Sequence, residues 1–269
     1  MMVSIIIPCY NHGRYLEEAL SSVAKSVGEA AVEVIIVDDG STDPFTKQLL
    51  PQLAARGYRV ITQANQGLAA ARNNGIAVSS GKYFIPLDSD NKLAGPYLTT
   101  AVQLLENDPT IDAVYGNPVF FGDERDARGT GLRRVGAFDL NKILDCNYID
   151  ACGIIRKSAW EKVGGYDGRM PLMGNEDWEL WITLALAGGK IHYLDEVCFY
   201  YRVAADSMSA TDFYASEKHT RNRAYIYEKH SSQLVSSLLR DVQKHETVAQ
   251  YIKHNRLKSI AKLVLGYKL

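Results

Sequence analysis

Apolar residues in the first ninety positions form two alternating kinds of segment. Short runs rich in β-branched or aromatic residues predict buried strands, and segments with apolar or small residues at helical spacing predict helices. The predicted strands are residues 3–8, 32–37, 59–62 and 83–87. The predicted helices are centred on residues 16–27, 49–53 and 67–78. This alternating order predicts an α/β fold with a mostly parallel, Rossmann-like central sheet flanked by helices.

The pattern is less regular after Asn91. Further helices are predicted at residues 93–106, 157–163 and 176–187, and further strands at residues 113–115, 119–121, 148–155, 190–194 and 198–203. The charged, glycine-rich residues 122–134 predict a long surface loop. From about Thr211 the sequence is polar and helical in character. We therefore predict one domain over residues 1–210, with halves 1–91 and 92–210, and a helical C-terminal extension over residues 211–269.

Composition limits the classes of function that fit this chain. It has 269 residues and a formal net charge of −1, so it lacks the basic field of a general nucleic-acid-binding protein. No apolar run reaches the roughly 18 residues that cross a bilayer, and no basic segment precedes the first apolar strand. The four cysteines form no CxxC pair and no His-linked metal pattern. These features predict a reduced, cytoplasmic setting.

The fourth predicted strand ends in two acids, Asp88 and Asp90, followed by Asn91. Open α/β sheets bind ligands outside the carboxyl ends of their strands, so both carboxylates are expected at a binding edge. Two acids this close repel each other unless a positive group lies between them, and a divalent cation that carries a phosphate would fill that place. Taken alone, Asp-Ser-Asp-Asn also has the composition of an ordinary polar turn.

Six segments carry a recognisable pattern when taken in order: VSIIIPCYN at 3–11, VDDGSTD at 37–43, NQGLAAARNNG at 65–75, DSD at 88–90, GGYD at 164–167 and EDW at 176–178. Together they resemble the nucleotide-sugar glycosyltransferases of family 2, which have the GT-A fold. The likeness covers residues 2–210. It implies inverting transfer of a sugar from a nucleoside-diphosphate donor, more often UDP than GDP, to an acceptor hydroxyl. Such reactions assemble polysaccharides or glycolipids, so a carbohydrate or lipid-linked acceptor is expected.

Residues at the ends of the first two strands are candidates for binding the nucleoside. Asp39 offers a hydrogen-bond acceptor, and Tyr10, which follows Pro8, offers a planar surface near the sheet edge. The resemblance implies that Asp39 reads a pyrimidine ring and that Pro8 and Tyr10 contact the donor. As alternatives, Asp39 is a turn or N-cap residue and Tyr10 is a core aromatic residue.

Arg72 lies in a predicted helix of small residues, and the resemblance directs its guanidinium to the phosphate or sugar of the donor. An ion pair with Asp38 or Asp88 is the alternative. Asp90 is expected to ligate Mn²⁺ or Mg²⁺, and Asp88 to contact the ribose or the same cation. Many relatives carry a histidine near the position of Ala204, so this chain departs from the family there. Close by, Arg202 is a further candidate for the diphosphate.

Inverting transfer also needs a base that takes the proton of the acceptor hydroxyl. The resemblance matches the second acid of the Glu176-Asp177 pair to the base of the family, which makes Asp177 the candidate. Glu176 is the alternative base, and capping of a helix by both acids is the purely structural alternative. Trp178 is expected either to form a wall against a sugar ring or to be a buried indole.

Two other functions remain open on these residues. A nucleotidyltransferase that forms the sugar nucleotide would carry a glycine-rich, basic loop after the first strand, where this chain has CYNHGR at residues 9–14. A non-catalytic protein that binds sugar nucleotides on the same fold is the other alternative, because fold does not fix function. Asp88, Asp90 and Asp177 favour an enzyme over this second alternative.

The last thirty residues, 240–269, contain more lysine and arginine than acid, and Leu257, Ile260, Ala261 and Val264 share one predicted helical face. A basic amphipathic helix can lie on an anionic membrane, which would place the protein at the inner face of the membrane and suit a lipid-linked acceptor. The alternative is a helix that packs on the catalytic domain or on a second copy of the chain.

Overall fold

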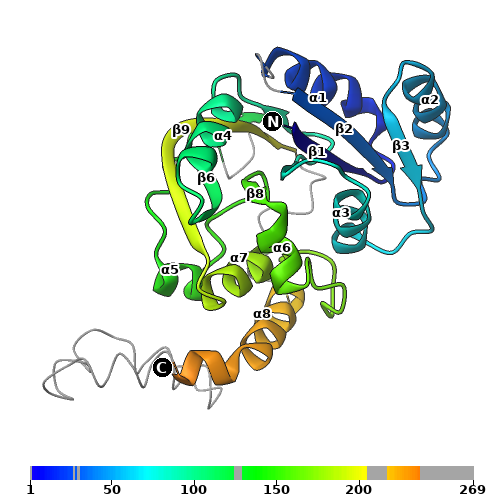
Figure 1. Ribbon diagram of the computed structural model, residues 1–269. Helices are drawn as coiled ribbons and strands as arrows, with labels where there is room; N and C mark the ends of the chain where they lie inside the picture. Colours follow the sequence, from blue (N-terminus) through cyan, green and yellow to red (C-terminus); the bar gives the residue numbers. More distant parts are fainter. Residues whose placement is uncertain (1, 27, 29–30, 124–128, 205–216, 237–269) are drawn as a thin grey trace, which may run out of the picture.

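The computed structural model describes residues 2–26, 28, 31–123, 129–204 and 217–236. The strands are β1 (Met2–Cys9), β2 (Ala31–Asp38), β3 (Arg59–Thr62), β4 (Tyr83–Pro86), β5 (Lys92–Leu93), β6 (Ile111–Gly122), β7 (Gly131–Leu132), β8 (Ile154–Arg156) and β9 (Lys190–Val203). The helices are α1 (Gly13–Ser26), α2 (Pro44–Ala55), α3 (Leu68–Ala77), α4 (Tyr97–Asn107), α5 (Leu140–Asp145), α6 (Lys157–Val163), α7 (Glu176–Leu186) and α8 (Glu217–Lys229). One sheet connects the strands in the order β3-β2-β1-β4-β8-β6-β9-β5, and β7 pairs with β6 (Figure 1).

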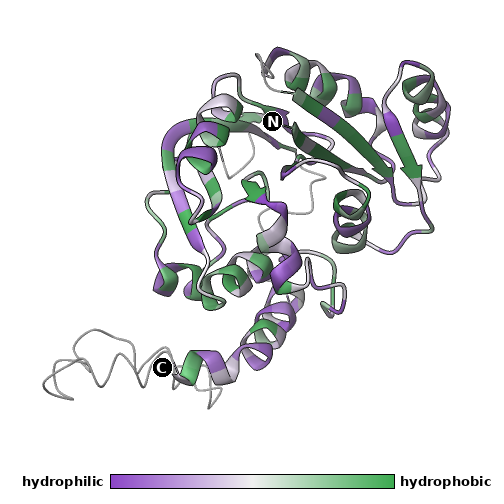
Figure 2. Ribbon diagram, in the orientation of Figure 1, coloured by the Kyte–Doolittle hydropathy of each residue, from purple (hydrophilic) through white to green (hydrophobic). Residues whose placement is uncertain are grey.

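The N-terminal half of the sheet is parallel. β1 pairs in parallel with β2 and with β4, and β2 pairs in parallel with β3. Along β1, Val3, Ile5 and Ile7 belong to the core cluster that includes α1 and α2, whereas Ile6 belongs to the cluster on the other face with α3. Side chains of a strand alternate between the two faces of a sheet, and both faces here are covered. Both faces of β1 are therefore mostly apolar, and Figure 2 shows the N-terminal strands largely in green.

The second half of the sheet is mixed. β8 pairs in antiparallel fashion with β4 and with β6, whereas β6 and β9 run parallel over most of their length. The antiparallel pairs are shorter than the parallel ones, so the sheet is mostly parallel overall. The predicted α/β class and the mostly parallel sheet flanked by helices are confirmed.

Some predicted elements of the second half differ from the structure. The helix predicted at 93–106 begins only at Tyr97, because Lys92–Leu93 forms β5 against β9. The strand predicted at 148–155 is wrong over most of its length, since β8 begins at Ile154. The two strands predicted between 190 and 203 are the single strand β9, in which register shifts against β6 absorb the irregular middle.

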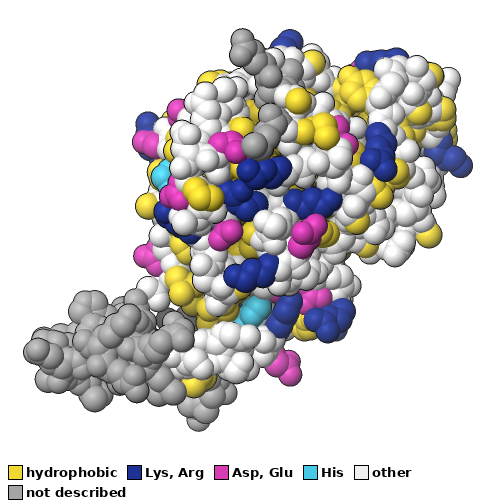
Figure 3. Space-filling model, in the orientation of Figure 1, with side chains coloured by type: hydrophobic (Ala, Val, Ile, Leu, Met, Phe, Trp, Pro, Cys, Tyr) yellow, Lys and Arg dark blue, Asp and Glu magenta, His cyan; other side chains and the backbone are white. Residues whose placement is uncertain are grey.

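The remaining predictions concern the loop at 122–134 and possible contact with a membrane. The loop predicted at 122–134 contains the short strand β7, and residues 124–128 lie outside the described residues. Lys and Arg side chains are interspersed with Asp and Glu on the face shown in Figure 3. Within the described ranges, no helix is both long and apolar enough to cross a membrane. The basic helix predicted within residues 240–269 lies outside the described residues.

Candidate functional site

A cavity of about 600 Å³ opens where β1, β2 and β4 end and extends to β6, β9 and the start of α7. This volume is within the usual range for small-molecule sites, and the edge at the carboxyl ends of parallel strands is the usual place for one. Seven residues that the sequence predicts for the site line this cavity: Pro8, Tyr10, Asp39, Arg72, Asp88, Asp90 and Asp177. The further candidate Arg202 does not line it. The fold therefore brings together side chains from both halves of the chain.

Asp39 lies at one end of the cavity, just beyond β2. Its Oδ1 accepts hydrogen bonds from Gln63 Nε2 and the Gln66 amide, both at 2.8 Å, and its Oδ2 accepts from the Gly67 amide at 2.9 Å. The N-cap of α2 is Asp43, so the interpretation of Asp39 as a helix cap is wrong. A carboxylate has about four acceptor positions, so Asp39 both holds the loop before α3 and keeps capacity for one more donor.

Tyr10 lies near Asp39 on the same side of the cavity. Its side chain is 44% exposed, so it is not a core aromatic residue. An exposed ring at the mouth of a cavity provides the planar surface on which a base can stack.

Arg72 connects the two halves of the site. It is only 2% exposed, and its guanidinium donates to Asp88 Oδ1 at 2.7 Å and to Glu176 Oε1 at 2.6 Å. Of the two predicted partners, Asp88 is confirmed and Asp38 is wrong, because Asp38 Oδ1 accepts from the Ser41 amide instead. Burial alone would lower the pKa of Arg72, but the neighbouring carboxylates Asp88 and Glu176 raise it well above its usual value. The guanidinium is therefore permanently charged.

Asp90 lies beside Asp88 in the turn that follows β4. Burial, and then repulsion from Asp88, raise the pKa of Asp90 to about 6, although His12 and Arg202 act in the opposite direction. The Nε of Arg202 donates to the backbone carbonyl of Asp90 at 3.0 Å, and its guanidinium also binds Glu18. Arg202 does not line the cavity, so its position gives no support to a contact with the diphosphate.

A metal centre built from the protein alone is absent from the part of the chain that the structure describes. No three or more His, Cys, Asp or Glu side chains gather there in an arrangement that could hold an ion. The predicted ligands Asp88 and Asp90 both line the cavity.

Asp177 approaches the cavity from the first turn of α7. Its Oδ1 accepts from Asn147 Nδ2 at 3.1 Å and from the Trp178 amide at 2.7 Å. Burial, and then repulsion from Glu176, raise the pKa of Asp177 to about 6, while Arg72 and these two hydrogen bonds lower it. Neither acid is the N-cap of α7, because that position is Asn175.

Both carboxylate oxygens of Glu176 bind other groups of the protein. One oxygen binds Arg72 and the other accepts from the Gly174 amide at 3.1 Å. Trp178 is fully buried and donates from Nε1 to the Ile143 carbonyl, so the interpretation as a buried indole is correct. Of the two acids, Glu176 binds a cation and Asp177 does not: within the described residues, the Asp177 carboxylate has no cationic partner at hydrogen-bond distance.

Comparison with known proteins identifies the family. The family model described as glycosyl transferase family 2 matches residues 4–164. The chain belongs to glycosyltransferase family 2. An uncharacterized glycosyltransferase of Nostoc sp. is 29% identical over 84% of this chain and 72% of its own length. The Escherichia coli enzyme named UDP-Glc:alpha-D-GlcNAc-diphosphoundecaprenol beta-1,3-glucosyltransferase WfaP is 29% identical over 79% of this chain and 81% of its own length.

Solved structures support the same fold. The crystal structure of S. aureus TarS 1–349 in complex with UDP-GlcNAc has a TM-score of 0.63 and 21% sequence identity. That likeness covers 86% of this chain and 73% of the TarS chain. The GT-A fold predicted for the chain is confirmed.

Two polar residues of this family 2 glycosyltransferase were not predicted from the sequence. Asp150 lines the cavity, and its Oδ1 accepts from the Cys152 amide at 2.9 Å. Burial, followed by repulsion from Asp88 and Asp177, raises the pKa of Asp150 to about 8. Asn147 lines the cavity beside it. The available signal was a single acid in the apolar run 148–155, where an unpaired carboxylate would be costly in an ordinary strand.

The cavity of the glycosyltransferase has an apolar wall on the side of β6 and β9. The rings of Phe120 and Tyr201 stack there with centroids 4.8 Å apart and planes at 27°. Pro118, Val135 and Phe199 line the same region. Aromatic faces of this kind can pack against the apolar face of a sugar ring.

Proposed function

We propose that this glycosyltransferase moves a sugar with inversion from a UDP-type donor to an acceptor hydroxyl, with Asp177 as the base. The observation that carries the proposal is that four acids line one cavity and that Arg72 binds two of them. Asp88 and Glu176 bind the guanidinium, while Asp90 and Asp177 line the same cavity with pKa values raised to about 6. One free carboxylate thus lies on the side of the strand ends and the other at the start of α7.

The UDP-type donor is supported by the end of the cavity near β1 and β2. Asp39 has capacity for one further donor such as a base N–H, and the exposed ring of Tyr10 and the edge of Pro8 lie at the same end. Two similar proteins point the same way, since the name of the E. coli relative contains UDP-Glc and the TarS structure contains UDP-GlcNAc.

The proposal includes a divalent cation, Mn²⁺ or Mg²⁺, at Asp88 and Asp90. Two carboxylates without a third protein ligand suit an ion that takes its remaining ligands from water and substrate phosphates. The raised pKa of Asp90 fits this donor set, because a charge placed beside two crowded acids relieves their repulsion. When bound, the cation would neutralise charge that develops on the departing diphosphate.

Asp177 is preferred to Glu176 as the base because its carboxylate is available. Asn147 orients Asp177 by a hydrogen bond to Oδ1, whereas both oxygens of Glu176 are engaged by Arg72 and the Gly174 amide. A carboxylate with a pKa near 6 is ionised at neutral pH and is still a better proton acceptor than an ordinary aspartate. In this scheme Asp177 takes the proton of the acceptor hydroxyl as the new glycosidic bond forms.

The acceptor would bind against the apolar wall around Phe120 and Tyr201, within the predicted acceptor half of residues 92–210. A carbohydrate or a lipid-linked sugar fits this wall, and the name of the E. coli relative contains a lipid-linked sugar diphosphate. We keep residues 1–91 as the donor half and residues 211–269 as an extension. Membership of family 2 favours this function over nucleotide-sugar synthesis or binding alone.

A panel of UDP-, GDP- and dTDP-sugars tests the proposal directly. Thermal unfolding is measured with each compound, with Mn²⁺ or with EDTA, and the stabilising donors are then incubated with sugar acceptors while nucleotide release and product anomer are followed. We expect UDP-sugars to stabilise the protein in the presence of Mn²⁺ and the product to have the opposite anomeric configuration to the donor. Retention of configuration, or stabilisation by GDP-sugars alone, would contradict the proposal.

A further inference from the structure

The helix α8 holds the segment that leads into the catalytic helix α7. Figure 1 shows α8 beside α6 and α7, on the side of the molecule away from β1, β2 and β3. Its contacts reach residues 172–175, immediately before the acids Glu176 and Asp177. α8 lies in the C-terminal extension, beyond residues 4–164 that the family model matches.

Asn222 makes the contacts that fix this segment. It is fully buried, and its Oδ1 accepts from the Leu172 amide at 3.1 Å. Its Nδ2 donates to the Leu172 carbonyl at 3.0 Å and to the Gly174 carbonyl at 2.7 Å. One side chain thus satisfies three backbone groups of a segment that belongs to neither a helix nor a strand. Buried backbone groups left without such partners are costly, so Asn222 specifies the path of this segment.

Asn175, the last residue of the segment 172–175, has an uncommon backbone conformation. It has φ 68°, in the left-handed region, and it directly precedes α7. His219, one turn before Asn222 on α8, contacts its side chain, with 3.4 Å between His219 Nδ1 and Asn175 Oδ1. The His219 ring also stacks on Trp178, with centroids 5.6 Å apart and planes at 11°. Both residues that flank the acidic pair are therefore in contact with α8.

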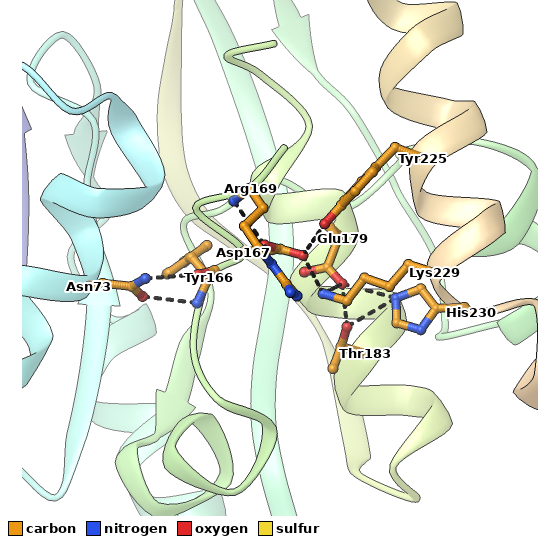
Figure 4. A network of polar contacts seen from close by, with 9 residues as sticks. All are labelled: Asn73, Tyr166, Asp167, Arg169, Glu179, Thr183, Tyr225, Lys229 and His230. Atoms are coloured by element: carbon orange, nitrogen blue, oxygen red, sulfur yellow. Dashed lines mark hydrogen bonds and ion pairs between the residues drawn. The ribbon is translucent and has the colours of Figure 1, made fainter. Parts of the chain in front are cut away.

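The C-terminal end of α8 forms ion pairs with residues of the catalytic domain (Figure 4). Lys229 Nζ binds Asp167 Oδ2 at 2.6 Å and Glu179 Oε1 at 2.7 Å, and His230 Nε2 lies 2.9 Å from the same Glu179 oxygen. Glu179 is fully buried on α7 and Asp167 is 7% exposed. Because buried carboxylates need partners, these contacts hold α8 against α7 in one position.

We propose that Asn222 is a positioning residue for sugar transfer. Through the backbone of residues 172–175 it sets where α7 begins, and hence where Asp177 meets the acceptor hydroxyl. The inference rests on the proposed function of Asp177 as the base, and it makes α8 a working part of the active site. None of the contacts of Asn222 reaches Asp39 or Tyr10, so we expect nucleoside binding there to be unaffected.

The kinetic test compares Asn222→Ala and Asn222→Asp with Arg221→Ala, an exposed neighbour on the same helix. Asn222→Asp keeps the volume and the acceptor for the Leu172 amide but places an oxygen that cannot donate against both carbonyls, so the two variants remove these contacts in different ways. We expect kcat to fall about 10–100-fold, because misplacement of a catalytic group by about 1 Å has an effect of this size. The KM for the donor and the Kd for UDP should stay near wild-type values. Unchanged kcat, or an equal loss of UDP affinity, would overturn the inference.

Amide hydrogen exchange separates this inference from the proposed function. In both Asn222 variants we expect faster exchange over residues 172–178 and unchanged exchange in β1, with wild-type behaviour throughout in Arg221→Ala. Where the wild-type protein transfers no sugar from any donor, the proposed function fails and exchange alone decides whether Asn222 holds the segment. Exchange over residues 172–178 that matches the wild type would remove the positioning role.

Discussion

The cavity contains two acidic pairs, Asp88 with Asp90 and Glu176 with Asp177, that share one guanidinium. In each pair one acid binds Arg72 and the other has a pKa raised to about 6. The pairs differ in how they are built. Asp88 and Asp90 follow directly from the end of β4, whereas Glu176 and Asp177 depend on contacts from distant parts of the chain, including Asn147 and Asn222.

The difference shows how similar acidity can serve two purposes. Next to burial, the largest influence on Asp90 is its charged neighbour Asp88, so a cation placed between them would be strongly favoured. Asp177 accepts a directed hydrogen bond from Asn147, which orients one carboxylate for proton transfer. Under the proposed function, the first pair holds positive charge and the second accepts a proton.

The largest expected effect is on the proton acceptor. Asp177→Asn should lower kcat by about 10²–10⁴-fold, the usual contribution of a general base. UDP affinity should stay unchanged, because the amide keeps the shape of the side chain and lies away from Asp39. Steady-state kinetics and calorimetry measure the two quantities. Glu161→Gln, which replaces an exposed acid on α6, is the matched control and should leave both unchanged. Normal turnover by Asp177→Asn would show that the second pair supplies no base.

The second prediction concerns the guanidinium that the pairs share. Arg72→Met leaves the buried carboxylate of Glu176 and the partly exposed carboxylate of Asp88 without their cationic partner, so it should lower the free energy of unfolding by about 3–5 kcal/mol. Arg56→Met removes an exposed pair with Glu17, where both side chains are about half exposed, and should cost less than about 1 kcal/mol. Urea unfolding of both variants gives the comparison. Equal losses would mean that Arg72 does not join the two pairs energetically.

The same contrast explains how much the sequence could predict. Asp39, Asp88 and Asp90 follow strands with strong apolar patterns, so their common edge was predictable from the order of elements. The ion pair between Arg72 and Glu176, which lie 104 positions apart, was not predicted. Asp150 was assigned to a strand, because a run of apolar residues around one acid does not show whether the backbone pairs in a sheet or lines a cavity.

The C-terminal extension presents the same limit. A helix was predictable where α8 lies, but nothing local to Asn222 indicates that its side chain binds a segment fifty residues earlier. Short-range rules of spacing and capping determine elements, whereas contacts between distant segments depend on how the elements pack. The position of Asp39, Asp88 and Asp90 at one edge of the sheet was therefore largely predictable from the sequence. For Asp177 the sequence indicated the residue but not the contacts that position it.

The third prediction tests the first pair as a seat for positive charge. In the wild-type protein, UDP should bind about tenfold or more tightly with Mn²⁺ than with EDTA, a difference of at least about 1.4 kcal/mol. Asp90→Ala should remove this dependence on Mn²⁺, whereas Asp177→Asn should retain it. Isothermal calorimetry with each protein measures the affinities. Wild-type, Mn²⁺-dependent affinity in Asp90→Ala would show that the two pairs do not differ in the proposed way.

The smallest expected effect concerns the hydrogen bond that distinguishes Asp177 from Asp90. A base must be ionised, so kcat should fall as the pH drops through about 6, the raised pKa of Asp177. The Asn147 amide stabilises the ionised form, so Asn147→Ala should raise that pKa further and move the acidic limb of the profile to higher pH. A shift of about half a pH unit corresponds to about 0.7 kcal/mol, a usual value for one hydrogen bond.

The pH profile of kcat is measured at saturating donor, with the exposed Asn141→Ala on α5 as the control. Since ionisation of Asp177 is complete well above its pKa, the variant should lose most activity near pH 6 and least near pH 8. A shift of the limb to lower pH would mean that Asn147 does not act on the ionised base.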